Sequence, residues 1–143
     1  MFFHSRKYCF IDTHGKKSHF AFNNTQIFES LNRFKANFQK AFEADWKKKS
    51  GELKQKYVFE SWEAIITKGT KETCNVKDFS ESGKGGLKIL FKDKDSKPIA
   101  FIWMRGSGTE PVFRIMCDVK GDKPDMEKAL LEWETELIKK ADK

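Results

Sequence analysis

The sequence predicts an α+β domain, in which a small antiparallel sheet of about four strands is covered on one face by helices. Three observations lead to this class. Apolar residues recur at helical spacing near residues 25–48, strand-like runs follow between residues 86 and 119, and a second helical stripe runs to residue 143. A sheet that is covered on only one face is typical of antiparallel strands.

The composition is that of one folded domain. The 143 residues are 38% hydrophobic, and 14 phenylalanines and four tryptophans argue against a disordered chain. No apolar run reaches the roughly 18 residues of a membrane span. The first residues lack the cationic and apolar regions of a signal peptide, so a cytoplasmic location is expected. The three cysteines, Cys9, Cys74 and Cys117, have no CxxC spacing, so neither a zinc site nor a disulfide framework is indicated.

The charge balance is basic. Lysine and arginine total 28 and aspartate and glutamate total 21, which gives a net charge of +7. A basic surface favours anionic partners, nucleic acid among them. Most of the lysines are scattered among acidic residues, with small clusters at 47–49 and 139–140. This pattern favours a solvated surface, and nucleic acid is an unlikely partner.

The first half of the chain predicts a helix after an unassigned start. Residues 1–24 remain an uncertain N-terminal segment, in which 6–12 and 19–22 read as short strands around a turn, and residues 25–143 form the predicted domain. A helix is expected from about Thr25, a candidate N-cap, to Lys48. Ser50-Gly51 is expected to break it, before a shorter helical piece at 52–57. Its apolar stripe has spacings of three and four, typical of a core-facing helix: Ile27, Leu31, Phe34, Phe38 and Phe42.

The second half predicts a three-strand meander and a final helix. Residues 65–86 are polar and read as a loop, with a strand near 65–67. Strands are expected at 87–92, 99–104 and 112–119, with a turn at 93–98. In the last strand Cys117 lies on the core side, and Arg114 and Asp118 lie on the other. Pro124 suits the first turn of a helix whose apolar stripe is Met126, Leu130, Trp133 and Leu137.

A polar stretch, MRGSGTEPVF at residues 104–113, separates two of the most apolar runs. Gly106 and Gly108 let the backbone turn without Cβ atoms, so successive N–H groups can converge on an anion. Ser107 and Thr109 add hydroxyl donors, and Arg105 adds a planar fork that matches phosphate oxygens. The composition therefore fits a phosphate group. It fits a long hairpin loop with a solvated arginine equally well, because glycine and serine are common in turns.

The run from Arg105 to Pro111 resembles the R-x-S-G-T-E-P phosphate-binding loop of the α-D-phosphohexomutases, which include phosphoglucomutase and phosphomannomutase. The resemblance is clearest over residues 83–140. It implies the C-terminal domain of a four-domain enzyme, a small sheet-and-helix domain that closes a cleft. By position, Arg105, Gly106, Ser107, Gly108 and Thr109 would bind the substrate phosphate.

The resemblance also implies a reaction. In that family a phosphoserine gives its phosphoryl group to the sugar, a hexose bisphosphate forms and turns around, and the other phosphoryl group returns to the serine. The loop must accept a phosphate on either carbon, which backbone donors and an arginine can do. Hexose 1-phosphate and 6-phosphate are thereby interconverted in carbohydrate metabolism. Mg²⁺ and the bisphosphate would serve the parent enzyme, and this chain alone would bind neither.

The remaining motifs of the family are not matched. Ser18-His19 lacks the surroundings of the phosphoserine loop, and Asp93 and Asp95 lack the third aspartate and the arginine of the metal loop. Glu81-Ser82-Gly83 echoes the sugar loop, but that loop belongs to a preceding domain, so a coincidence is expected. His4, His14 and His19 indicate no metal site.

This chain is therefore expected to be inactive alone. It is either the C-terminal domain of a mutase, working with the remaining domains of that enzyme, or a free-standing remnant. Two alternatives stay open. One is a stand-alone module that binds phosphosugar or phosphate. The other, less favoured, is a basic α+β domain that binds nucleic acid through aromatic residues of an open sheet face, such as Phe91, Phe101 and Trp103.

Overall fold

The chain folds into one sheet with two long helices against it. The computed structural model describes residues 5–11, 24–83, 85–106, 113–121 and 123–141, with side chains from Arg33 onward except at 106 and 113. The elements in chain order are β1 (Ser5–Ile11), α1 (Asn24–Tyr57), β2 (Ser61–Lys68), β3 (Lys71–Thr73), the short 3-10 helix η1 (Phe79–Ser82), β4 (Gly86–Lys92), β5 (Pro98–Gly106), β6 (Phe113–Val119) and α2 (Pro124–Ala141).

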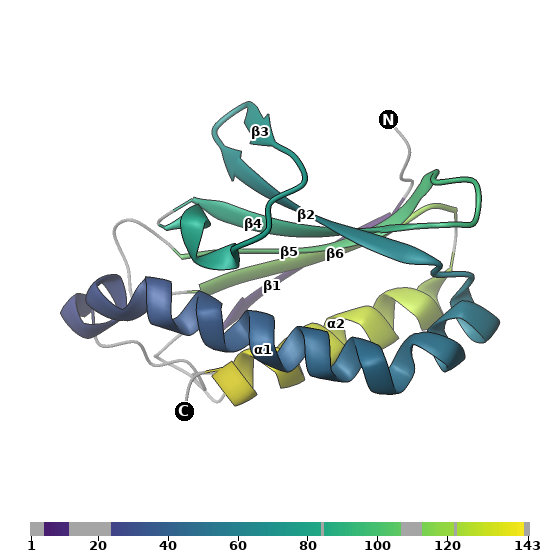
Figure 1. The fold of residues 1–143 in the computed structure, drawn as a ribbon, viewed down its shortest axis with the longest axis horizontal. Coiled ribbons are helices and arrows are strands. Elements are labelled where there is room, and N and C mark those ends of the chain that lie inside the picture. The colour runs from purple at the N-terminus through teal and green to yellow at the C-terminus, as the bar shows by residue number, and fades with distance from the viewer. Residues whose placement is uncertain (1–4, 12–23, 84, 107–112, 122, 142–143) are drawn as a thin grey trace.

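The strands form a six-stranded antiparallel sheet in the order β1-β6-β5-β4-β2-β3. Both long helices lie against the same face, and the β2–β3 hairpin and η1 stand at one end of the sheet (Figure 1). The predicted α+β class and the helices on one face are thus confirmed. The sheet has more strands than expected, because β1 and β3 extend the central meander on its two sides.

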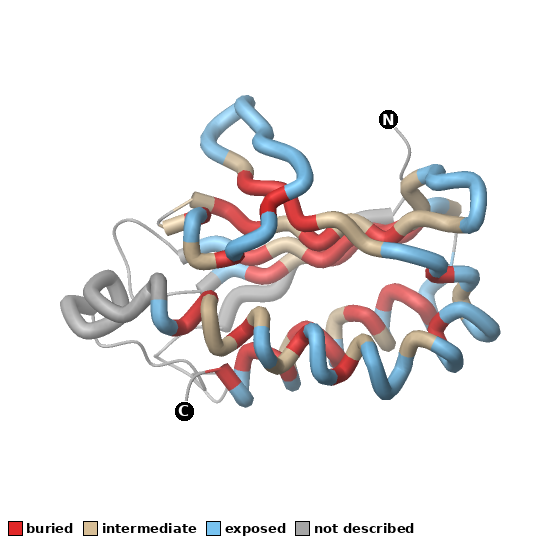
Figure 2. Tube along the Cα trace, in the orientation of Figure 1, coloured by how far each residue is buried: buried red, intermediate tan, exposed pale blue. Residues whose placement is uncertain are grey.

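The core lies between the sheet and the helices (Figure 2). Alternate residues of four strands point into it, including Leu87, Ile89 and Phe91 of β4, all 0% exposed. From the helix side, Phe42 stacks on Trp133 of α2 at 5.4 Å between ring centroids. Cys117 is buried in this core, as its strand position predicts.

Helix α1 does not break at Ser50-Gly51 as expected, but continues to Tyr57. An isolated glycine costs a helix only about 1 kcal/mol, and burial of Leu53 beyond it offsets that. The helix ends in a left-handed cap instead. Val58 has φ +66°, its N–H donates to the carbonyl of Lys54 at 3.0 Å, and the N–H of Phe59 donates to that of Leu53 at 3.3 Å.

Two further expectations need revision, and one is confirmed. Residues 61–68 form a full strand, where only a short strand near 65–67 was expected, and its apolar residues Ala64 and Ile66 face the core. The expected loop at 65–86 contains β3 and η1. The short strand expected at 6–12 is confirmed as β1, which joins the sheet by pairing with β6 from Ser5↔Val119 to Ile11↔Phe113. The expected short strand at 19–22 lies outside the described residues.

A polar contact joins the two helices inside the fold. Asp45 of α1, 7% exposed, accepts a hydrogen bond from the indole N–H of Trp133 at 3.0 Å and pairs with Lys140 at 3.3 Å. Burial acts to raise the pKa of Asp45, but these donors outweigh it and hold that pKa below its ordinary value. Asp45 therefore links α1 and α2 through its negative charge.

Within the described ranges, no helix combines the length and apolar character needed to cross a membrane.

Candidate anion-binding site

The register of the sheet brings Arg105 to one end of it, beside β4 and β2. Leu87 of β4 pairs with Met104 of β5, and both are buried in the core. Arg105, one residue further, therefore lies on the opposite face of the sheet and is exposed. On the other side of β4, Thr67 pairs with Gly86. Thr67, Gly86 and Arg105 thus form a row across three strands.

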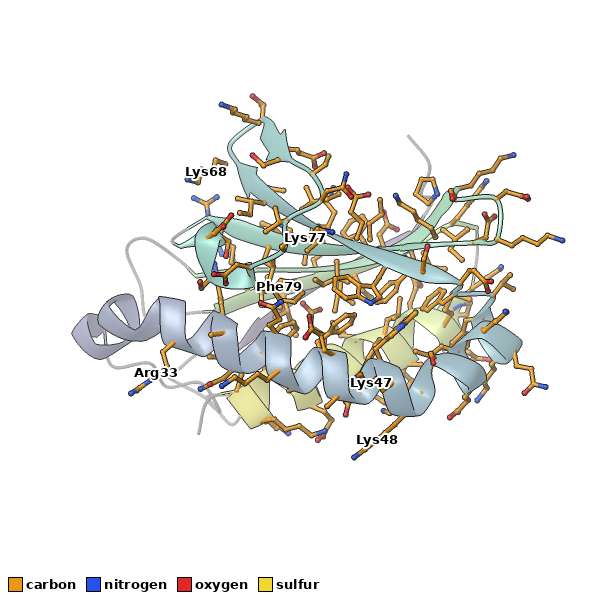
Figure 3. The ribbon with its side chains drawn as sticks, viewed as in Figure 1. Arg33, Lys47, Lys48, Lys68, Lys77 and Phe79 are labelled. Atoms are coloured by element: carbon orange, nitrogen blue, oxygen red, sulfur yellow. The ribbon has the colours of Figure 1, made fainter. Side chains whose placement is uncertain are left out.

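An open pocket of about 480 Å³ lies at this end of the sheet. Its cationic side chains are Arg105 and Lys68, and Glu81 supplies a carboxylate. In Figure 3, Lys68 lies between the β2–β3 hairpin and η1, at the same end of the molecule. The lining comes from β2 and its turn, from η1 and the loop after it, and from β5: Thr67, Lys68, Gly69, Glu81, Ser82, Gly83, Gly85 and Arg105.

The pocket wall formed by residues 79–83 and 85 is held in place by local hydrogen bonds. Asp78 caps η1, because its carboxylate accepts from the N–H of Ser80 at 3.0 Å and from its hydroxyl at 2.7 Å. The buried hydroxyl of Ser82 donates to the carbonyl of Phe79 at 2.8 Å. Gly83 then turns the chain with φ +50°, a conformation that suits glycine. The N–H of Gly85 returns to the carbonyl of Ser82 at 2.7 Å.

Helix α1 packs against this wall and holds it in position. Phe79 is 0% exposed and packs near Phe38 and Phe42 of α1 (Figure 3). Gln39 accepts from the N–H of Phe79 at 3.0 Å and donates to the carbonyl of Lys77 at 2.9 Å. The pocket wall is therefore attached to a long helix and does not depend on its own short turn alone.

Lys35 is the most unusual side chain near the pocket. It is 1% exposed, and its Nζ donates to the carbonyl oxygens of Gly83 at 2.7 Å and Gly85 at 2.9 Å. Among the described residues, the Nζ of Lys35 makes no other hydrogen bond. Burial lowers the pKa of this ammonium from 10.5 to about 8. A charge buried against neutral carbonyls is a costly arrangement, so its position beside the pocket is informative.

Gly86 keeps the middle of the row across the strands open. A Cβ atom there would overlap the hydroxyl of Thr67 and the indole nitrogen of Trp103. Without one, the indole N–H of Trp103 reaches across β4 and donates to Thr67 at 3.1 Å. This bond orients Thr67 at the pocket's edge.

The sequence-predicted loop starts at this pocket. Gly106, the last residue of β5, pairs with Phe113, the first of β6, so both ends of the 107–112 segment are fixed side by side. Ser107, Gly108 and Thr109 lie outside the described residues. Directly across from Arg105 stands Arg114, also exposed.

The structure also changes how Glu81-Ser82-Gly83 is interpreted. The triplet was expected to resemble the sugar loop only by coincidence, but it lines the same pocket as Arg105. Lys35, Thr67 and Lys68 were missed altogether. One signal was available for Lys35. It falls between Phe34 and Phe38 on the apolar stripe of α1, where a lysine is out of place.

Of the other candidate residues, the structure describes Asp93 and Asp95. Asp93 and Asp95 stand at the β4–β5 turn, where the Asp93 carboxylate accepts from the N–H groups of Asp95 at 2.9 Å and Lys97 at 3.0 Å. In the described part of the chain, no three His, Cys, Asp or Glu side chains gather as metal ligands would. These residues do not fit a Mg²⁺ ion. His4, His14 and His19, like Ser18, are outside the described residues.

Comparison with known proteins adds no relative. Neither a protein-family model, nor a curated protein, nor a solved structure matches the chain. The interpretation of the pocket therefore rests on its own residues and on the loop motif.

Proposed function

We propose that this chain is the substrate-phosphate-binding domain of an α-D-phosphohexomutase. Arg105 carries the proposal, because it opens the R-G-S-G-T-E-P motif and also lines the pocket beside Lys68. The order of elements agrees with this role: strand β5, the motif, strand β6 and helix α2. A guanidinium and backbone N–H groups recognise a phosphate whichever sugar carbon carries it.

In the parent enzyme this domain would hold the non-reacting phosphate of a hexose phosphate while another domain transfers the second phosphoryl group. The serine nucleophile and the Mg²⁺ ligands would come from other domains, so the chain alone would bind phosphosugar without converting it. Such an enzyme of carbohydrate metabolism would be cytoplasmic. Affinity should be weak, with a Kd of roughly 1 mM, because only one wall of the cleft is present.

The test is a titration of the full 143-residue chain with glucose 1-phosphate, followed by the backbone amide signals. We expect saturable shifts at residues 83–86 and 105–109. Arg105→Ala should weaken binding at least about tenfold, since it removes charge-assisted hydrogen bonds. Arg33→Ala is the matched control, because Arg33 projects from α1 away from the sheet (Figure 3) and should leave the affinity unchanged. Equal affinity of the wild type and the Arg105 variant would refute the proposal.

Two comparisons within the same experiment separate the alternatives. Inorganic phosphate that binds as tightly as glucose 1-phosphate would indicate a module that recognises phosphate without the sugar. An oligonucleotide that shifts the exposed face of the sheet, while glucose 1-phosphate shifts nothing, would favour the nucleic-acid hypothesis. Binding of that kind would also weaken steeply with salt.

A further inference from the structure

We propose that Lys35 is the positioning residue of the Arg105 pocket, and that its ammonium group makes anion binding there dependent on pH. The proposal rests on the function proposed above and adds a residue and a mode of regulation that the loop motif does not contain. Lys35 lies 70 positions before Arg105 in the sequence and belongs to a helix on the other face of the sheet.

Among the described residues, the side chain of Lys35 hydrogen-bonds only to the wall of the pocket. Its Nζ reaches the carbonyl oxygens of Gly83 and Gly85, on either side of one peptide turn. Both glycines line the pocket. With these two carbonyls directed at the ammonium, the backbone of the turn is held in one orientation. Lys35 itself is 1% exposed and does not line the pocket, so it acts on a ligand through the wall.

Phe79 and Gln39 attach the η1 end of the wall to α1, but among the described residues Gly83 and Gly85 have few other contacts. Gly83 and Gly85 have no side chains to pack, and Gly83 adopts a left-handed φ of +50°. Apart from the two Lys35 bonds, the turn is held by the N–H groups of Gly83 and Gly85, which donate to Ser80 and Ser82 within the same short segment. A glycine turn loses more conformational entropy on ordering than other residues do. The two hydrogen bonds from Lys35, which come from outside the turn, therefore help to keep it ordered before a ligand binds.

The charge on Lys35 should change within an accessible pH range. Its pKa, lowered to about 8 by burial, places deprotonation between neutral and mildly alkaline pH. A neutral amine still has donors, but a charge-assisted hydrogen bond is roughly twice as strong as a neutral one. Loss of the proton therefore loosens the turn and also removes a positive charge from behind the pocket. Both effects weaken the binding of an anion.

Other charged groups around this lysine must be distinguished from it. Glu81 of η1, Lys68 at the end of β2 and Arg105 of β5 line the pocket, and Asp78 caps η1. The ligand keeps its charge from pH 7 to 9.5, since the second pKa of a phosphate monoester is about 6. The contribution of Lys68, the lysine that lines the pocket, is separated from that of Lys35 by mutation.

The experiment measures the Kd of the full chain for glucose 1-phosphate between pH 7 and 9.5. For the wild type we expect a loss of affinity of about fivefold across this range, centred near pH 8, which corresponds to about one net hydrogen bond. Lys35→Met should bind about fivefold more weakly at pH 7 and show no dependence on pH. Amide signals of Gly83 and Gly85 should titrate near pH 8 in the wild type without ligand, and not in the variant.

Two control variants sharpen the result. Lys40→Met removes an exposed lysine of the same helix and should leave both the affinity and its pH dependence unchanged. Lys68→Met should weaken binding at every pH but keep the fall around pH 8. If Lys35→Met does not fold, Lys35→Gln takes its place, because its side-chain amide can still donate to the turn. The affinity of Lys35→Gln at pH 7 should lie between that of the wild type and the fivefold weaker value expected for Lys35→Met.

The outcomes separate the two proposals. If the wild type binds with the same affinity from pH 7 to 9.5, or if Lys35→Met binds like the wild type, the role of Lys35 is refuted and the proposed function stands. If the wild type shows no binding at any pH, both proposals fail. A purely structural lysine would lower the melting temperature when replaced, without altering the affinity or the pH profile of the folded chain.

Discussion

Replacing Lys35 with methionine should have opposite effects on stability at neutral and at alkaline pH. Burial lowers the pKa of Lys35 from 10.5 to about 8. Because each pKa unit corresponds to about 1.4 kcal/mol, the folded chain holds this charged lysine at neutral pH at a cost of about 3 kcal/mol. Methionine removes that charge, but leaves the carbonyls of Gly83 and Gly85 without a donor, at about 1 kcal/mol each. The variant should therefore be more stable than the wild type by about 1 kcal/mol at pH 7.

The sign changes as the pH rises. Between pH 8 and 10.5 the unfolded wild type keeps the lysine proton while the folded wild type has released it, so the free energy of unfolding increases with pH. By pH 10 the wild type should gain about 2–3 kcal/mol relative to Lys35→Met. The variant should then be the less stable protein by about 1–2 kcal/mol, if the two contributions above are additive.

Urea unfolding at pH 7, 8, 9 and 10, followed by tryptophan fluorescence, measures this difference directly. Lys40→Met serves as the control, and its stability should stay parallel to that of the wild type at every pH. A stability difference between Lys35→Met and the wild type that does not change with pH would refute the reasoning. So would a variant that is less stable by more than about 2 kcal/mol at pH 7, since hydrogen bonding would then outweigh the burial of charge.

Three other substitutions test the fold. Val58→Gly should stabilise the chain by about 1 kcal/mol and raise the melting temperature, because Val58 has φ +66° and is 54% exposed. Gly86→Ala should destabilise it by about 1–3 kcal/mol and shift the fluorescence of Trp103, whose hydrogen bond the new methyl group would displace; an unchanged spectrum would contradict this. Asp45→Asn should reduce the free energy of unfolding by about 1–3 kcal/mol at pH 7, because a neutral amide loses the ion pair with Lys140 and accepts a weaker bond from Trp133. Because the pKa of Asp45 is lowered, the wild type should lose this stability as the pH falls below about 3.8, and the difference should then disappear.

The parts of the fold that were predictable have strong local patterns. The alternation through Ile115 and Cys117 identified β6, and Pro124 marked the start of α2. The missed break at Gly51 has a physical reason. A glycine weakens a helix by about 1 kcal/mol, and that is less than the core can offset through Leu53 beyond it. Helix propensity therefore predicted correctly that Gly51 weakens the helix, but not that the helix continues through it.

The candidate site was only half predictable. Arg105 was identified because seven adjacent residues carry a recognisable pattern. Thr67 and Lys68 were not identified, and Glu81 was noted only as a coincidental echo of another loop. Only the pairing of β2 with β4 and the packing of η1 on α1 bring these residues to the pocket. Lys35 was an exception of another kind. Its place on an apolar stripe was visible in the sequence. Its partners are backbone carbonyl oxygens, which every residue has, so the sequence could not indicate which residues they belong to.

The pairing of β1 with β6 matters for any shortened version of this chain. β6 leads away from the loop at 107–112, and β1 covers the edge that β6 would otherwise present. At the far side of the sheet the edge strand β3 has only 3 residues and includes Lys71, features that discourage association. A chain that begins at Thr25 would lack β1 and offer an uncovered seven-residue strand to its neighbours. Self-association by strand addition would then compete with the fold, directly beside the loop proposed to bind phosphate.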